Sequence, residues 1–237
     1  LLQFNPSFKS STELKDLVAE GVITENTKRA FGEISLFEHQ VEAIRKGTQG
    51  EGFVVTSGTG SGKSLTYLTT VFDHILKMEP KQKGIKAFLV YPMNALINSQ
   101  EQEIRKYELR YLRSFVGGSG SEVGEPAQVD QEIRELRAKT GKVFPITYRK
   151  YTGQEGDEAR ESIRTEQPDI ILTNYMMLEL IMTRQREDWM RVSMQDNLRF
   201  VVLVFIDARA GGRGDLHEAE AADPLGLEFE QPLNRAK

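Results

Sequence analysis

Apolar residues along this chain fall into two recurring patterns, short continuous runs and helical spacings. Five nearly apolar runs predict buried strands, at residues 53–55, 87–91, 146–148, 170–172 and 200–206. Between them, apolar residues recur every three or four positions, which predicts amphipathic helices at residues 36–46, 63–78 and 95–112. Apolar strands that alternate with helices are typical of a parallel sheet covered on both faces. We therefore expect an α/β fold with a doubly wound parallel sheet.

An insertion and a tail interrupt this alternation. We expect residues 1–30 to form a helical lead-in and residues 31–207 to form the α/β domain. Residues 208–237 are rich in Ala, Gly and acidic residues, and we expect an irregular tail there. The insertion, at about residues 113–145, begins with the flexible segment GGSGSEVGEP and contains a polar helix at residues 129–139.

The composition is that of a soluble globular protein, with 39% hydrophobic and 28% charged residues. No apolar run approaches the roughly 20 residues of a membrane-spanning helix, so we expect no membrane partner. The chain has no cysteine, which excludes disulfides and thiolate metal sites and favours a cytoplasmic location. A formal net charge of −4 argues against coating nucleic acid by bulk electrostatic attraction, although it leaves a local groove open.

A glycine-rich segment, TSGTGSGKS at residues 56–64, follows a predicted strand and precedes a predicted helix. In such turns backbone N–H groups hold phosphate oxygens, and the positive end of the helix adds to the attraction. We expect Lys63 to reach the β- and γ-phosphates and the Ser64 hydroxyl to bind Mg²⁺. The strict pattern has Gly at the position of Ser57. The predicted phosphate-binding residues are Ser57, Gly58, Thr59, Gly60, Ser61, Gly62, Lys63 and Ser64.

The form of this loop and the segment upstream of it resemble one family of P-loop proteins. A small residue followed by x-T-G-S-G-K is the form found in superfamily 2 DEAD/DEAH-box helicases. The segment LFEHQ at residues 36–40 is similar to the Q motif of these proteins. The resemblance implies a RecA-like domain that binds ATP with Mg²⁺, in which Gln40 reads the adenine edge and Phe37 packs on the base. It spans roughly residues 37–207.

Three further segments resemble motifs with which these helicases hold one nucleic-acid strand. YPMNALINSQ at residues 91–100 resembles motif Ia, YTG at residues 151–153 resembles motif Ib, and residues 168–178 resemble a strand-then-threonine segment. Polar groups at such turns bind phosphates without reading sequence. The similarity to large bacterial helicases of DNA repair and phage defence favours single-stranded DNA over RNA. The implied nucleic-acid contacts are Asn94, Asn98, Thr152, Gly153, Thr173 and Asn174.

The family pattern breaks at the end of the last apolar run. There the resemblance implies a strand ending in Asp-Glu, whose Asp holds Mg²⁺ and whose Glu polarises the attacking water. Asp207 ends the run and is a predicted metal ligand and, with Lys63, a predicted catalytic residue, but Ala208 replaces the Glu. Losing a positioned general base typically lowers a rate by about 10²–10⁴. The family also requires a second RecA-like domain, which these residues do not supply, so we expect little or no turnover from this chain alone.

Two other functions stay open at this point. A P-loop ATPase that remodels protein complexes would share the phosphate-binding loop. A nucleotide-dependent nucleic-acid-binding module without turnover would account for the missing Glu. Lys106, Arg110 and Arg113 recur along one predicted helix and either line a nucleic-acid path or form a solvated face. Trp189 lies in a polar segment and is a candidate for stacking on a base.

Overall fold

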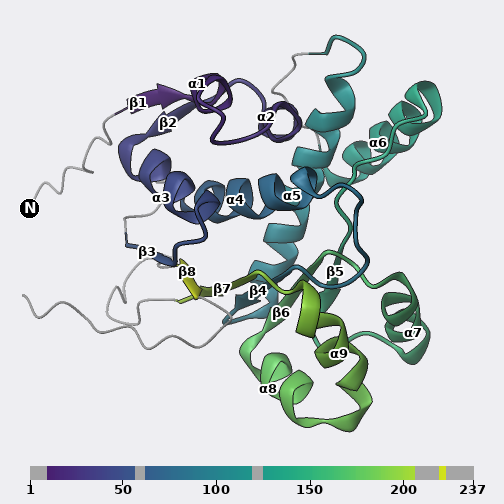
Figure 1. Cartoon of the computed structure of the whole chain (residues 1–237). Helices are drawn as coiled ribbons and strands as arrows, with labels where there is room; N and C mark the ends of the chain where they lie inside the picture. The colour runs from purple at the N-terminus through teal and green to yellow at the C-terminus, as the bar shows by residue number, and fades with distance from the viewer. Residues whose placement is uncertain (1–9, 57–61, 119–124, 206–218, 223–237) are drawn as a thin grey trace, which may run out of the picture.

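The computed structural model of the chain describes residues 10–56, 62–118, 125–205 and 219–222 (Figure 1). Its main sheet has six described strands in the order β3-β8-β7-β4-β6-β5. The strands are β3 Phe53–Val55, β4 Ala87–Tyr91, β5 Tyr148–Tyr151, β6 Ile170–Asn174, β7 Phe200–Val204 and β8 Ala219–Ala222.

Four neighbouring strands form the parallel part of this sheet. β4 pairs with β6 and β7, and β5 pairs with β6, all in parallel. Strand β4 lies at the centre, and all five of its residues are buried because both faces of the sheet are covered. The predicted doubly wound parallel sheet is therefore confirmed for β5, β6, β4 and β7.

Strand β8 occupies the position between β3 and β7 and runs antiparallel to both. Ala221 pairs with Phe53 on one side and Val202 on the other, so β8 links the strand before the glycine-rich segment to the rest of the sheet. The prediction of an irregular tail is wrong for residues 219–222. The tail carries no apolar periodicity, so its own sequence gave no strand signal, and the strand is held by hydrogen bonds to its two neighbours.

Helices cover both faces of the sheet. In Figure 1, α3, α4 and α5 lie on one side of it, and α7, α8 and α9 lie on the other. A 3₁₀ turn, Gln185–Glu187, joins α8 to α9. The helices are α1 Leu14–Ala19, α2 Glu25–Phe31, α3 Glu38–Thr48, α4 Lys63–Lys77, α5 Asn94–Arg113, α6 Pro126–Thr140, α7 Asp157–Glu166, α8 Tyr175–Thr183 and α9 Asp188–Asn197.

Two apolar clusters fill the space between the sheet and its helices. Successive strand residues point to opposite faces, so Leu89 of β4 joins one cluster while Phe88 and Val90 join the other. The first cluster packs the sheet against α1 to α6, and the second packs it against α7, α8 and α9. Trp189 packs against the second cluster, which argues against the base-stacking role considered for it.

The N-terminal segment differs from the predicted helical lead-in. Helices α1 and α2 are present, but Ser10–Glu13 forms strand β1, which pairs antiparallel with β2, Ser35–Phe37. The strand Ser10–Glu13 therefore leads directly into α1, and its last residue, Glu13, is the N-cap of that helix. The Glu13 backbone N–H donates to Asp16 Oδ2 at 3.0 Å and caps α1.

A charged network stabilises the amino-terminal ends of the parallel strands. Asp169 is 2% exposed, and its carboxylate accepts hydrogen bonds from Thr147 N at 2.7 Å and Thr147 Oγ1 at 2.8 Å. The same carboxylate pairs with Lys86 Nζ at 3.1 Å and Lys81 Nζ at 2.6 Å. Lys86 is fully buried, and the ion pair with Asp169 offsets the cost of burying its ammonium group.

No described helix is both long enough and apolar enough to cross a membrane.

Candidate nucleotide and nucleic-acid sites

Of the loop predicted to bind phosphates, the structure describes Thr56 and the residues from Gly62 onward, directly before α4. Gly62 is the N-cap of α4 with φ +68°, a left-handed conformation that favours glycine. Lys63 and Ser64 are the first two residues of α4, where a helix presents its positive end. The predicted residues Ser57, Gly58, Thr59, Gly60 and Ser61 lie outside the described residues.

Gln40 contacts Gly62 and holds the start of α4 in place. Gln40 is 3% exposed, and its Nε2 donates to the Gly62 carbonyl at 3.1 Å. Its Oε1 accepts from the Phe37 backbone N–H at 2.8 Å, which caps α3. A Cβ on Gly62 would lie 2.5 Å from Gln40 Nε2, so the two positions are fitted to each other. Both polar atoms of the predicted adenine-reading amide therefore already make a structural bond.

A cavity of about 590 Å³ opens beside Gly62, Lys63 and Ser64. Its size is within the range of small-molecule sites in proteins. Gln40 and Phe37 line it on the side of α3, and Phe37 stacks on His39 with ring centroids 5.9 Å apart. The structure thus brings the predicted base-binding and phosphate-binding residues to one cavity.

The same cavity is also lined by a buried polar cluster that the sequence did not predict. The Tyr67 hydroxyl of α4 donates to Gln100 Oε1 of α5 at 3.0 Å and lies 3.2 Å from the Tyr91 hydroxyl. Burial raises the pKa of both tyrosines, so both hydroxyls stay protonated at neutral pH. Gln100 Nε2 is buried and has no hydrogen-bond partner among the described residues. A donor in that state needs a water or ligand acceptor.

The last described residues of β7 lead to the same cavity. Val204 lines it, and its carbonyl accepts a hydrogen bond from the Tyr175 hydroxyl at the start of α8. The Tyr175 ring also stacks on Phe205, with centroids 5.9 Å apart. Asp207, the predicted Mg²⁺ ligand, lies outside the described residues, as does Ala208.

Three of the turns predicted to hold nucleic acid meet at the carboxyl edge of β4, β5 and β6. Asn174 Nδ2 donates to Asn94 Oδ1 at 2.8 Å and lies 3.5 Å from the Thr152 carbonyl. Asn174 Oδ1 accepts from the Met177 backbone N–H at 2.8 Å and so caps α8. These residues are far apart in sequence, and parallel pairing of the strands brings their turns together.

Asn98 lies one turn further along α5 and is exposed. Its Oδ1 accepts a hydrogen bond from Lys150 Nζ of β5 at 3.0 Å, and Lys150 also pairs with Glu101 at 2.9 Å. Lys150 therefore adds a cation next to a predicted phosphate contact. The sequence signal for it was weak, because a single Lys in a short polar strand is common on protein surfaces.

The role predicted for Thr173 is wrong as a side-chain contact. Thr173 is fully buried, and its hydroxyl donates to the Tyr151 carbonyl at 2.7 Å. It follows Leu172 in β6, where both faces of the strand are covered and four of the five residues are buried. Thr173 links β6 to β5 and thereby positions the turn that contains Thr152.

Thr152 and Gly153 share one unexpected partner, the carboxylate of Glu155. Oε2 of Glu155 accepts from Thr152 N at 2.8 Å and from Gly153 N at 2.9 Å, and Oε1 accepts from Thr152 Oγ1 at 2.8 Å. Gly153 has φ +88°, a left-handed conformation that favours glycine. An acidic residue two positions after a Thr-Gly turn is a common surface pattern, so the sequence did not single it out.

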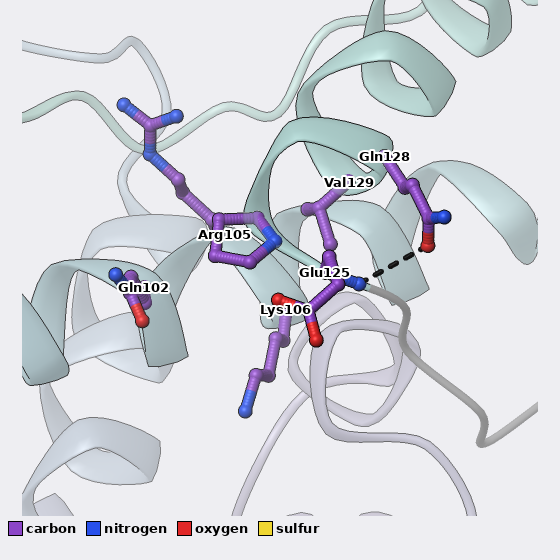
Figure 2. Close-up of a pocket in the computed structure, with 7 residues that line it drawn as sticks. Gln102, Arg105, Lys106, Glu125, Gln128 and Val129 are labelled. Carbon is purple, nitrogen blue, oxygen red and sulfur yellow. Dashed lines mark hydrogen bonds between the residues drawn. The ribbon is translucent and has the colours of Figure 1, made fainter.

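Two basic residues of α5, Arg105 and Arg113, attach α6. Arg113 forms two parallel bonds with Glu132, at 2.6 and 2.7 Å, and Arg105 pairs with Asp130. Figure 2 shows the hollow between the two helices, where Arg105 and Lys106 leave α5 in different directions. These contacts favour a structural role for Arg113 over a nucleic-acid path.

Comparisons with known proteins agree with this arrangement. Residues 37–129 match the family model of DEAD/DEAH box helicases. The Druantia protein DruE of Escherichia coli (strain UMEA 4076-1) is 27% identical over 158 residues, covering 63% of this chain and 8% of DruE. The DUF1998 helicase MrfA, solved bound to DNA and AMPPNP, has a TM-score of 0.57 at 22% identity and covers 85% of this chain and 22% of its own. The DEAD-box helicase Mss116, bound to ssRNA and UDP-BeF, has a TM-score of 0.50 at 17% identity over 74% of this chain and 31% of its own.

These matches confirm the predicted RecA-like fold and the resemblance to superfamily 2 helicases. Residues 37–129 are thus similar to DEAD/DEAH box helicases, and this similarity supports nucleotide binding there. The chain spans less than a tenth of DruE and less than a quarter of MrfA.

Proposed function

We propose that this chain is the ATP-binding motor domain of a nucleic-acid helicase and that it acts on single-stranded DNA. In this proposal, ATP binding and hydrolysis drive movement along one strand when the domain is joined to a second RecA-like domain. The observation that carries it is the position of two sites on one sheet. The nucleotide cavity and the cluster of Asn94, Thr152 and Asn174 both lie at the carboxyl ends of the strands.

For the nucleotide, the chemistry of the cavity supports phosphates at one end and a base at the other. Lys63 and Ser64 stand at the positive end of α4, which attracts phosphate oxygens. Phe37 supplies an apolar face and Gln40 an amide on the side of α3. We assign the triphosphate to the first group and the adenine to the second.

For Mg²⁺, the described residues include the hydroxyl ligand expected from the sequence. The Ser64 hydroxyl lines the cavity one residue after Lys63, and hydroxyl and carboxylate oxygens are the ligands that Mg²⁺ accepts in proteins. Asp207 would supply the carboxylate, and β7 leads toward the cavity through Val204. Bound Mg²⁺ would neutralise phosphate charge.

For nucleic acid, the polar turns suit a phosphate backbone and carry no base-reading pattern. Asn94, Asn98 and Lys150 provide neutral and charged groups within reach of one another. The relatives support a nucleic-acid partner, since MrfA was solved with DNA and Mss116 with ssRNA. The choice of DNA rests on the similarity to MrfA, which was solved bound to DNA.

The test is equilibrium binding of a fluorescent ATP analogue with Mg²⁺, with and without single-stranded DNA or RNA of one length. Replacing Lys63 by Ala should weaken nucleotide binding by roughly ten- to a hundredfold, the value of one charge-assisted hydrogen bond. Lys83→Ala, which removes an exposed lysine from a loop, is the charge-matched control and should leave the affinity unchanged.

Three outcomes would contradict parts of the proposal. Unchanged affinity in Lys63→Ala would exclude the nucleotide site. Nucleotide binding that no nucleic acid affects, in a protein that binds neither strand, would point to an ATPase that remodels proteins. Preference for RNA over DNA would overturn the choice of strand and leave the motor domain in place.

A further inference from the structure

The turn after β5 binds an anionic group of the chain itself, the carboxylate of Glu155. Three donors converge on the Glu155 carboxylate, namely the backbone N–H groups of Thr152 and Gly153 and the Thr152 hydroxyl, at 2.8 to 2.9 Å. Successive N–H groups in a turn with one left-handed residue form a concave anion site. A phosphate oxygen and a carboxylate oxygen make the same demands on such a site, because both are anionic acceptors.

The position of this turn ties it to the nucleic-acid site. The Thr152 carbonyl lies 3.5 Å from Asn174 Nδ2, and the same Nδ2 donates to Asn94. Arg160 of α7 donates from Nη2 to the Gly153 carbonyl at 3.2 Å, which fixes the turn from its other side. A strand that crosses Asn94 and Asn174 therefore passes next to Thr152 and Gly153, and Gly153 is exposed to receive it.

The donors of this turn cannot serve two anions at once. Each backbone N–H provides one hydrogen, and Glu155 already accepts both of them. A phosphate can bind there only after the carboxylate leaves. The carboxylate lies at the end of a side chain with several rotatable bonds, and Glu155 is partly exposed. The carboxylate can therefore turn outward without unfolding the helix that follows.

We propose that Glu155 is an internal competitor for a backbone phosphate of the bound strand at Thr152 and Gly153. This inference rests on the proposed function, because it deepens the assignment of that site. Exchange of carboxylate for phosphate keeps the three donors paired in both states, so no unpaired donor penalises release. The competitor lowers affinity for the strand and eases its release, as stepwise movement along a strand requires.

The experiment measures affinity for a single-stranded DNA oligonucleotide in the 237-residue chain and in three variants. Glu155→Ala removes the competitor, and Glu155→Gln keeps its shape without its charge. Glu158→Gln is the control, because it removes an equal charge from an exposed position on α7. We expect both changes at Glu155 to tighten binding on the order of tenfold, and Glu158→Gln to change it less than about twofold.

Hydrogen exchange at Thr152 and Gly153 separates competition from a general effect on folding. Without DNA, Glu155→Ala should exchange these two amides faster than the original chain, and added DNA should slow them again. A Glu155→Ala protein that binds DNA no more tightly than the original chain, or no differently from Glu158→Gln, would overturn the competitor while the proposed function stands. Failure of all four proteins to bind any strand would contradict the proposed function itself.

Discussion

At the scale of single residues, Gln40 connects the start of α3 with the start of α4, two segments that are far apart in the sequence. Its Oε1 caps α3 through Phe37 N, and its Nε2 holds the Gly62 carbonyl at the start of α4. An amide oxygen has a second lone pair and an amide nitrogen a second hydrogen, so a further contact with a base is chemically open to it. Its first effect, however, is to fix where the phosphate-binding turn ends.

We predict that Gln40→Met weakens binding of ATP and GTP by the same factor. The reason is that the lost bond to Gly62 displaces the phosphate site, which both nucleotides share. Loss of the α3 cap should also lower the free energy of unfolding by about 1 kcal/mol. Competition of the two nucleotides against one fluorescent analogue measures the first effect, and denaturant unfolding measures the second.

Gln131→Met, on an exposed face of α6, is the matched control and should change neither value. A loss confined to ATP would instead establish that Gln40 reads the adenine edge, as its resemblance to the Q motif implied.

The residues predicted to contact nucleic acid show what sequence can and cannot predict about a site. Asn94, Thr152 and Asn174 were predicted from their resemblance to helicase motifs, and the parallel pairing of the strands brings their turns to one edge. Thr173 was assigned to the same surface because the pattern gives order along the chain but no direction for a side chain. Its hydroxyl bonds the Tyr151 carbonyl of β5 instead. Glu155 and Gln100 were missed. The partner of Gln100 comes from another helix, and Glu155 bonds a turn two to three residues before it through a loop geometry that a sequence pattern does not show.

At the scale of elements, α6 is attached to α5 by both apolar and charged contacts. Val129, Ile133 and Leu136 are buried against the core, and Arg113 pairs with Glu132 through two bonds. The hydrogen bond from Arg113 lowers the pKa of Glu132 from its ordinary value of 4.5. A lowered carboxyl pKa stabilises the fold at higher pH, and this stabilisation is lost as pH falls through the lowered value.

We predict a coupling between Arg113 and Glu132 that is present at neutral pH and absent in acid. In a double-mutant cycle of Arg113→Met and Glu132→Gln, the coupling at pH 7 should be about 1 kcal/mol or less, because the pair is partly exposed to solvent. It should decline only below pH 4.5, since the pKa of Glu132 is shifted downward. Urea unfolding of the four proteins at several pH values measures it.

The exposed pair Arg164 and Glu161 within α7 provides the comparison, and its coupling should be smaller at every pH. A coupling for Arg113 and Glu132 that stayed constant down to pH 3, or was zero at pH 7, would contradict the anchoring role.

The elements that were predicted well are those whose signal lies within the element. Strand β4 has five consecutive apolar residues, and its bounds match the predicted 87–91. Helix α5 has apolar residues at regular spacing over 20 residues and was also found. Strands β1 and β8 were missed because their hydrogen-bond partners are distant in sequence. Helix α7 was missed because it buries a single apolar residue, Ile163, and so shows almost no period.

At the scale of the whole molecule, the two ends of the parallel sheet have different tasks. The carboxyl ends carry the nucleotide cavity and the polar turns. The amino ends carry the buried network of Asp169, Lys86 and Thr147. No ligand contact has been assigned to the second group, so its contribution should appear in stability alone.

We predict that Asp169→Ala destabilises the whole domain while leaving the binding sites intact. Removing the carboxylate leaves the charge of Lys86 buried without its partner, which typically lowers the free energy of unfolding by about 3–5 kcal/mol. Because β4 and β6 keep their ladder, the folded fraction should bind nucleotide and single-stranded DNA with unchanged affinity.

Asp196→Ala, at an exposed position near the end of α9, is the control and should change neither property. Calorimetric unfolding together with binding at low temperature, where the variant is folded, measures both. A fall in DNA affinity at full folding would show that the amino ends position the binding turns through the strands, and the division between stability and function would then be wrong.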